Sequence, residues 1–476
     1  MRIMINFLFL LTSLITLGQN DNGSYTVVKN VNIIDVKGSP IQSGMTVIIK
    51  GNRITSIEKT SKAKIPQNAL IIDAKNKYLI PGLWDMHVHV FNNVSKTLPD
   101  TNDFSMYITN GVTGIREMWT KIESMPEVDR WRKQAYEVPG TVPRIGAVGT
   151  MVDGFPSQIP NSDTATMEAG ARKIVQQIKA AGIDFVKVYN RLSRKAYFAI
   201  ADECKKQNID FAGHVPSKIL LKEAADAGQR SIEHLTGSRI IFDQGITCSL
   251  FVEEITKELP DSIKAGSPAV PIMEQILELC DKDKAFAIFR HMAEKNVWHC
   301  PTMVLYKRFA TDSSIVINDP RLKYISPSEK ELWKKETGPR LRKKPSGNYL
   351  GQAFAQVLQM KKAGIQFLAG TDFDNHYLYP GFSLHDELKL FVDAGFSPLE
   401  SLQTATINPA KFLGAMDSLG TIEKGKIADM VLLDANPLTD IRNTQRINAV
   451  FVNGKYLSKE TLQVMLDKAA AFVSKK

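Results

Sequence analysis

Apolar residues in this chain fall into short runs that alternate with longer stretches of helical periodicity. The short runs are rich in β-branched residues and favour strands, whereas segments such as 167–181 and 194–207 repeat their apolar positions as a helix does. This alternation is typical of a parallel β/α architecture. The number of runs predicts a (β/α)8 TIM barrel. The predicted strands are Lys77–His89, Val112–Met118, Arg144–Thr150, Phe185–Tyr189, Asp210–His214, Ser231–His234, Val297–Met303 and Gln366–Thr371.

The two ends of the chain differ from its middle and resemble each other. Both alternate polar and apolar residues in the manner of β-hairpins, with turns at Lys50-Gly51-Asn52 and at Asn453-Gly454. We therefore predict a small β-sandwich domain built from both termini. The predicted bounds are 20–80 and 416–476 for the two parts of this domain and 81–415 for the barrel.

The first residues of the chain have a composition of their own. Arg2 precedes an apolar run over residues 3–11, which fades through Gly18 into polar residues. This order is typical of a signal peptide, and we predict one at residues 1–19. A membrane anchor is the alternative, but it needs roughly 20 apolar residues. The mature protein is therefore predicted to be secreted or periplasmic, without a stable membrane span.

Positive charge is concentrated in one segment. The whole chain has a formal net charge of +10, and the segment between Pro301 and Gly347 is strongly enriched in Lys and Arg. This segment lacks interleaved aromatic residues and any nucleic-acid-binding module, so we predict no nucleic-acid partner. A long basic connection in a barrel suits a lid that attracts substrates with a free carboxylate, and a merely solvated loop is the alternative. The candidate carboxylate-binding residues are Arg308, Arg321, Arg340 and Arg342.

Candidate metal ligands stand at the ends of the predicted strands. His87 and His89 are two residues apart on one strand, so their side chains point the same way and can hold one metal ion together. Later strands contribute further candidates, namely Lys187, His214, His234 and Asp372. The carboxyl ends of barrel strands form one concave face. The pattern therefore predicts a metal site there, although each residue alone would also fit a core histidine or a solvated lysine.

Nine motifs together give the chain a family resemblance. In their order and spacing they resemble the amidohydrolase superfamily, and within it the prolidase and imidazolonepropionase-like branch. The motifs are IPGLWDMHVH (80–89), GVTGIRE (111–117), FVKVY (185–189), GH (213–214), EH (233–234), GTD (370–372), SLHDEL (383–388), TATINPA (404–410) and GKIADMVLLD (425–434).

The resemblance implies a metal-dependent hydrolase that acts on carbon–nitrogen bonds. It implies two divalent metal ions, and the nitrogen-rich ligand set suits Zn²⁺ most naturally. The implied arrangement is one ion held by His87, His89 and Asp372, a second held by His214 and His234, and a bridge from carboxylated Lys187. Asp372 would also take a proton from the attacking water and return it to the leaving amine.

Substrate contacts are predicted at two further residues. Tyr189 points to the same side of its strand as Lys187, with a barrel-core tyrosine as the alternative, and His376 closely follows Asp372. Relatives often carry a histidine after the third strand, whereas residues 149–155 contain none. The resemblance therefore leaves the substrate open.

The sequence as a whole predicts an exported amidohydrolase with a small-molecule substrate. A dipeptide such as Xaa-Pro or an N-acyl amino acid is the leading substrate class. The alternatives are a cyclic-amide hydrolase or deaminase with one metal ion, and a catalytically silent binding protein on the same scaffold. A homo-oligomer is compatible with the sequence.

Overall fold

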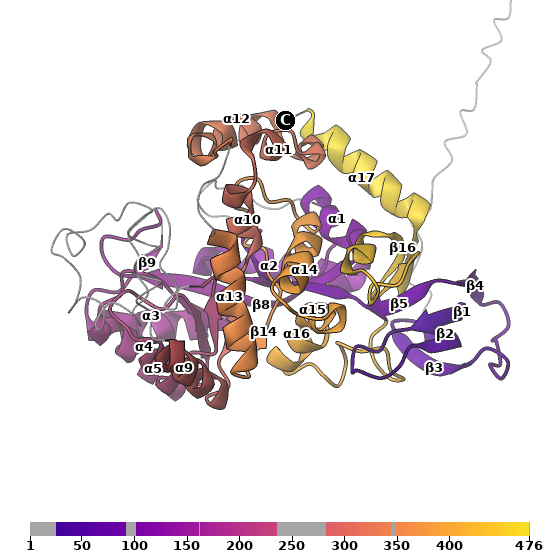
Figure 1. Cartoon of the computed structure of the whole chain (residues 1–476). Coiled ribbons are helices and arrows are strands. Elements are labelled where there is room, and N and C mark those ends of the chain that lie inside the picture. Colours follow the sequence, from indigo (N-terminus) through magenta and orange to yellow (C-terminus); the bar gives the residue numbers. More distant parts are fainter. Residues whose placement is uncertain (1–24, 92–100, 161, 236–281, 344–348, 476) are drawn as a thin grey trace, which may run out of the picture.

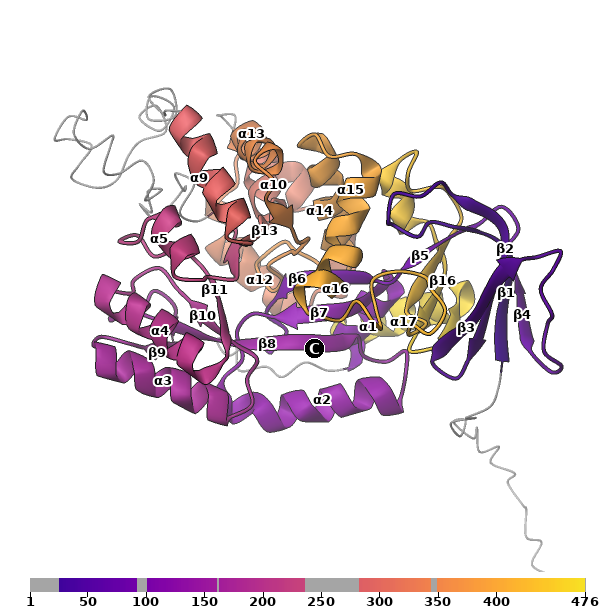
Figure 2. The same cartoon turned by 90° about the horizontal axis from the view of Figure 1, so that it is seen from below.

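The architecture consists of two sheets, one of which is surrounded by helices (Figures 1 and 2). A computed structural model describes residues 25–91, 101–160, 162–235, 282–343 and 349–475. The predicted signal peptide at 1–19 lies outside the described residues. No helix in the described part of the chain is long and apolar enough to cross a bilayer.

Parallel strands form the barrel. Their order is β6-β7-β8-β10-β11-β12-β13-β14, with the short β9 (Asp163–Thr164) paired to β8. A bridge between Val88 and Phe373 closes the ring, and Met86 N donates to Ala369 O at 2.9 Å beside it. The predicted (β/α)8 barrel is thus confirmed. The strands are β6 (Leu83–Val88), β7 (Val112–Glu117), β8 (Arg144–Asp153), β10 (Phe185–Val188), β11 (Asp210–Gly213), β12 (Ser231–Glu233), β13 (Trp298–Cys300) and β14 (Gln366–Phe367).

One predicted strand is wrong, because the run Lys77–His89 forms two strands in different sheets. β5 (Tyr78–Pro81) belongs to the sheet of the chain ends, and β6 opens the barrel. The break falls at Gly82, where a Cβ atom would lie only 2.1 Å from the Thr113 hydroxyl oxygen. A glycine therefore lets the chain pass closely from one sheet into the next.

Helices cover the outside of the barrel (Figure 2). α3 (Glu168–Ala180) and α4 (Arg194–Gln207) match the two predicted helical stretches. The Ser193 hydroxyl caps α4 by accepting from the backbone of its first turn, and Asn208 ends the helix in a left-handed conformation. The other barrel helices are α1 (Thr101–Thr109), α2 (Met125–Glu137), α5 (Leu221–Asp226), α9 (Lys282–Glu294), α13 (Tyr349–Lys362), α14 (Phe382–Asp393), α15 (Pro398–Thr404) and α16 (Ile407–Phe412), with a short 3₁₀ turn η1 (Ile122–Ser124).

Strands from both ends of the chain share the second sheet, as predicted. β5 pairs with β1 on one side and with β15 on the other, and Val47, Leu432 and Phe451 lie in one apolar core. The last helix, α17 (Lys459–Val473), leaves this sheet and packs along α1 of the barrel (Figure 1). The strands are β1 (Tyr25–Ile33), β2 (Gln42–Lys50), β3 (Arg53–Lys59), β4 (Leu70–Asp73), β15 (Met430–Leu433), β16 (Ile447–Val452) and β17 (Lys455–Ser458), with a 3₁₀ turn η4 (Ile441–Gln445).

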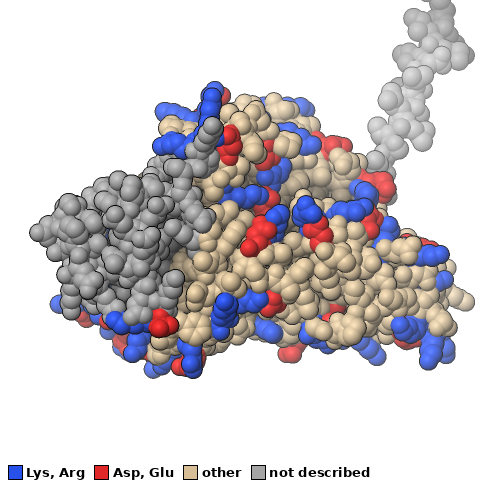
Figure 3. Space-filling view, viewed as in Figure 1, with Lys and Arg blue, Asp and Glu red and all other residues tan. Residues whose placement is uncertain are grey.

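The basic segment folds into short helices, and we call residues 301–343 the lid. Trp333 lies at the centre of its small core, against Ile325 and Tyr379. Basic and acidic side chains alternate on the upper part of the face seen in Figure 3. The lid elements are α10 (Val304–Ala310), α11 (Ser313–Val316), η2 (Pro320–Tyr324), α12 (Pro327–Glu336) and η3 (Gly338–Arg340).

Candidate metal centre

The predicted ligands meet at the carboxyl ends of the barrel strands. His87 and His89 stand at the end of β6, and Asp372 follows β14. One oxygen of Asp372 lies 3.1 Å from His87 Nε2 and 3.0 Å from His89 Nε2. Lys187 points into the same cluster from β10, with its Nζ 3.5 Å from each of these two nitrogens. Four of the six candidates are therefore in direct contact.

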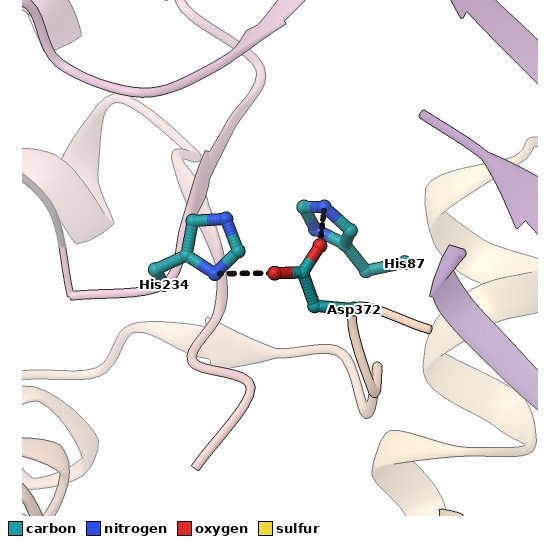
Figure 4. Close-up of side chains that lie close together, drawn as sticks. All are labelled: His87, His234 and Asp372. Carbon is teal, nitrogen blue, oxygen red and sulfur yellow. Dashed lines mark ion pairs between the residues drawn. The ribbon is translucent and has the colours of Figure 1, made fainter. Parts of the chain in front are cut away.

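The remaining two histidines extend the cluster. His214 and His234 follow β11 and β12, and their ring centres are 4.8 Å apart. The His234 ring is also 4.8 Å from the ring of His87. Figure 4 shows the Asp372 carboxylate between His87 and His234, whose Nδ1 lies 4.0 Å from it. Ligand atoms of these three buried residues lie within 4.8 Å of one another, a spacing suited to a metal ion.

Three of the four candidate histidines have a hydrogen-bond partner at Nδ1 that orients the ring. His87 Nδ1 lies 2.8 Å from a carboxylate oxygen of Glu233, to which it donates, and His214 Nδ1 lies 2.8 Å from Asn190 Oδ1. His234 Nδ1 lies 2.7 Å from the Thr302 hydroxyl. Because an amide oxygen only accepts, His214 carries its proton on Nδ1 and a lone pair on Nε2. This Nε2 is buried and has no hydrogen-bond partner among the described residues.

Burial sets the protonation states that metal binding requires. It lowers the pKa of His89 to about 4 and that of His234 to about 3, and it lowers the pKa of His214 well below the ordinary value. Burial alone would raise the pKa of Asp372, but the neighbouring imidazoles hold that pKa well below its ordinary value. At neutral pH His89, His214 and His234 are therefore neutral and the Asp372 carboxylate is ionised, which are the forms that bind metal ions.

Two of the candidate ligands have an unusual backbone. His234 has φ 59° and Asp372 has φ 61°, both in the left-handed region that non-glycine residues rarely adopt. Asp372 N donates to His87 O at 2.8 Å, and the Thr371 hydroxyl donates to Asp85 at 2.7 Å. These bonds hold the Gly-Thr-Asp turn against the strand that carries His87. Such conformations persist where the surrounding structure over-determines them, which is common at functional sites.

The two predicted substrate contacts have different surroundings. The half-buried Tyr189 ring lies 4.1 Å from the ring of His214, at the edge of the cluster. His376 packs against the lid, where its Nδ1 lies 2.7 Å from the Thr337 hydroxyl and its ring stacks on Trp333. Tyr189 therefore lies beside a candidate ligand, whereas His376 connects the loop after Asp372 to the lid.

Three of the four candidate carboxylate-binding arginines of the lid make contacts within the protein, and the side chain of the fourth, Arg340, lies outside the described part of the structure. Arg321 donates to Asp319 and, at 2.7 Å, to Asp386 of α14, so its guanidinium forms ion pairs with two carboxylates. Arg308 donates to the backbone carbonyl of His376. Arg342 donates to the carbonyl of Pro339 at 2.6 Å. These bonds hold the lid together and to the barrel.

Sequence reasoning missed the partners that orient the histidines. Glu233, Asn190 and Thr302 were not predicted as site residues, although Glu233 directly precedes a predicted ligand. Glu233 and Arg116 did carry a signal, because each is a charged residue inside a buried strand. A charge in such a place is seldom found without a partner.

A sequence model of the amidohydrolase family matches residues 78–457 of the chain, from β5 into β17, and the match includes all six candidate ligands. The chain belongs to the amidohydrolase family. Members of this family act on carbon–nitrogen bonds and generally bind divalent metal ions. The prediction of a metal-dependent enzyme is thus confirmed for this amidohydrolase.

Relatives of this amidohydrolase bear several different names. A 5-methylthioadenosine/S-adenosylhomocysteine deaminase of Caldanaerobacter subterraneus subsp. tengcongensis is 23% identical, over 91% of this chain and 93% of its own length. Among solved structures, a bottromycin amidohydrolase has a TM-score of 0.68 at 20% identity and covers 95% of this chain and 92% of its own. A putative prolidase from Bifidobacterium longum has a TM-score of 0.63 at 22% identity, with coverage of 94% and 99%. These similarities establish the fold and leave the substrate to be determined.

Proposed function

We propose that this amidohydrolase binds two divalent metal ions, most naturally Zn²⁺, and hydrolyses the amide bond of a dipeptide such as Xaa-Pro or of an N-acyl amino acid. The observation that carries the proposal is the position of Lys187. Its side chain is buried, and its Nζ lies 3.5 Å from Nε2 of both His87 and His89. A site for a single ion has no need of an amine in the middle of its ligands.

The chemistry of a buried amine explains why Lys187 suits a two-metal site. Burial lowers the pKa of Lys187, which favours the neutral, nucleophilic amine. When the amine nitrogen forms a bond to the carbon of carbon dioxide, one proton leaves and an anionic carbamate remains. The carbamate offers two oxygens, and nearby cations stabilise its charge.

The residues present fit two metal ions. The buried and unpartnered Nε2 of His214 points to a ligand, because a polar atom that loses water without a partner is costly. Imidazole nitrogens with carboxylate-like oxygens form a ligand set that suits zinc. In this proposal His87, His89 and Asp372 hold one ion, His214 and His234 hold the other, and carboxylated Lys187 joins them. Bound together, the two ions would lower the pKa of a water molecule and polarise the substrate carbonyl.

Protein groups supply the proton transfers and the orientation. Asp372 is ionised, so its carboxylate can accept a proton from the attacking water and deliver it to the leaving nitrogen. Asn375 Nδ2 donates to the second oxygen of Asp372 at 2.8 Å and keeps the carboxylate in place. Burial raises the pKa of Tyr189, so its hydroxyl keeps its proton and can donate to a substrate oxygen.

The name of one relative supports a second candidate function. The relative from Caldanaerobacter, similar over most of its length, is called a deaminase of methylthioadenosine and S-adenosylhomocysteine. The decisive experiment incubates the zinc-loaded protein with Xaa-Pro dipeptides, N-acyl amino acids and these nucleosides, and measures free amino acids and ammonia. We expect release of amino acids from the first two classes. Release of ammonia from nucleosides alone, with one zinc ion per chain, would replace the proposal with the deaminase.

We also propose that the protein is exported by residues 1–19. The support is the charged start, the apolar run and the polar end of this segment. Fractionation of cells that express the full chain, followed by N-terminal sequencing, tests the proposal. A chain that stays inside the cell and keeps Arg2 would refute it.

A further inference from the structure

A buried ion pair crosses the interior of the barrel beneath His87. Arg116 comes from β7 and Glu233 from β12, and the side chains are 1% and 0% exposed. Arg116 Nη2 donates to both oxygens of Glu233, each at 2.9 Å. One of these oxygens also accepts from His87 Nδ1 at 2.8 Å. The three side chains therefore form a continuous row that ends at a candidate metal ligand.

Further hydrogen bonds fix the pair in one geometry. Arg116 Nε donates to the carbonyl of Met86 at 2.6 Å, and its Nη1 donates to the Ser231 hydroxyl at 3.0 Å. The Ser231 hydroxyl in turn donates to Glu233. Glu233 thus accepts two bonds from the Arg116 guanidinium, one from the Ser231 hydroxyl and one from His87, and these bonds hold its carboxylate from several sides.

Packing alone does not account for this pair. Burying two charges costs several kcal/mol each, and well-packed apolar residues often serve stability as well or better. The surroundings are apolar, since the Phe412 and Phe185 rings lie 5.1 and 5.8 Å from the Arg116 guanidinium and Trp84 and Met86 belong to a neighbouring core. What an apolar replacement could not supply is an anionic acceptor for the proton on His87 Nδ1.

We propose that Glu233, held by Arg116, is a positioning residue that fixes the tautomer and orientation of His87 and strengthens His87 as a metal donor. The Glu233 bond keeps a proton on Nδ1, so Nε2, which lies toward Asp372 and Lys187, is the nitrogen that remains to bind a metal ion. This inference deepens the proposed two-metal site and rests on it.

The two proposed metal positions differ in the charge of the group that accepts the hydrogen bond from the histidine Nδ1. His87 donates to an ionised carboxylate, whereas His214 donates to the neutral amide of Asn190. A carboxylate partner raises the basicity of an imidazole ligand more than an amide does. Glu233 therefore makes the ion at His87 the more tightly bound of the two, and removing its charge weakens that ion selectively.

The first test compares Glu233→Gln with a control that also breaks a buried ion pair. In the control, Asp429→Asn, the lost partner is Arg144 at 3.1 Å, outside the barrel interior. Zinc affinities are measured by competition with a chromogenic chelator, and the ligand field is read from the visible spectrum of the cobalt-loaded proteins. We expect Glu233→Gln to lose about 10- to 100-fold in affinity for one of two ions and to change the cobalt spectrum. Asp429→Asn keeps both affinities and the spectrum.

A second pair of variants guards against misfolding. If Glu233→Gln leaves Arg116 unpaired and fails to fold, the double variant Arg116→Met/Glu233→Gln removes both charges and keeps an amide acceptor. We expect it to fold and to show the same loss of affinity for one ion.

A cavity of about 370 Å³ at the amino ends of the strands reaches Arg116 and is lined by Arg230 and Phe412. Guanidinium at low concentration should therefore enter the Arg116→Ala variant and restore the affinity, whereas urea should not.

The outcomes separate this inference from the proposed function. A wild-type protein that never binds two ions refutes the two-metal site itself. A wild-type protein with two ions, beside Glu233 and Arg116 variants of unchanged affinity and unchanged cobalt spectrum, refutes the positioning role alone. An equal loss at both ions, shared by Asp429→Asn, also refutes it, because the loss would then follow from general destabilisation.

Discussion

Replacing Lys187 with methionine should stabilise the metal-free protein and prevent the stabilisation that metal ions provide. Burial lowers the pKa of Lys187, so the folded state disfavours an ammonium that the unfolded chain keeps. Each unit of lowering costs about 1.4 kcal/mol of stability. This cost is complete below the folded pKa and disappears as the pH rises toward the ordinary value of 10.5. The gain from Lys187→Met should therefore be largest near or below neutral pH and fade in alkali.

The size of the expected Tm change in Lys187→Met follows from the burial of the side chain and from the chain length. Replacing buried charged groups with apolar ones of similar volume stabilises proteins by about 1–4 kcal/mol. For a chain of 476 residues the entropy of unfolding is about 1 kcal/mol per kelvin, so the metal-free Tm should rise by about 1–4 °C. Metal at 100 times its Kd adds about 2.7 kcal/mol per ion, or about 5 °C for two ions. Without Lys187 as the bridge, the variant loses most of this gain. Its Tm should therefore lie above that of the wild type without metal and below it in excess metal.

The assay is thermal unfolding in excess chelator and in excess zinc with bicarbonate. Lys426→Met is the control, since the Lys426 amine is buried but bonds Thr421 at 2.6 Å and Glu423 at 3.0 Å. It should lower the Tm under both conditions. A Lys187→Met protein that is less stable without metal, or that keeps the full shift with zinc, would refute the reasoning.

Three other outcomes are expected. Asp372→Asn should keep most of its metal by elemental analysis and lower kcat by about 10²- to 10⁴-fold, because proton transfer is lost; unchanged turnover would exclude Asp372 as the proton carrier. Asn190→Ala removes the acceptor of His214 and should weaken one zinc ion by about 10- to 100-fold in chelator competition, and equal affinity would contradict this. Arg321→Gln leaves Asp386 with one cationic partner and should speed hydrogen exchange in the lid, while exchange in the barrel strands stays unchanged.

The barrel strands could be predicted because both of their faces are buried. Such strands appear as apolar runs between turn-forming residues, and all eight runs overlap strands of the barrel. The error at Lys77–His89 arose because the chain leaves one buried sheet and enters another without a polar interruption. The Pro81-Gly82 pair is the sequence signal of this boundary, and the close approach of Thr113 shows why a glycine is required there.

The candidate ligands could be predicted because topology brings the carboxyl ends of parallel strands together. The partners that orient them could not, because the contact between Glu233 and His87 depends on which strands face each other across the barrel. The surroundings of His376 could not be predicted for the same reason. Its ring lies against Thr337 and Trp333 of the lid, and no local pattern near His376 indicates these contacts.

The pairing of β5 with β15 has a consequence for how the protein is made. Pro81 lies opposite Met430, so about 350 residues must be synthesised between the two, which takes roughly 20–70 s at typical ribosomal rates. During that time β1 and β5 have emerged, but β15, which pairs with the other edge of β5, does not yet exist. The exposed edge of an unpaired strand is a site of aggregation. A nascent chain of this enzyme therefore depends on β15 to cover the free edge of β5, and a chain truncated before β15 would keep that edge exposed.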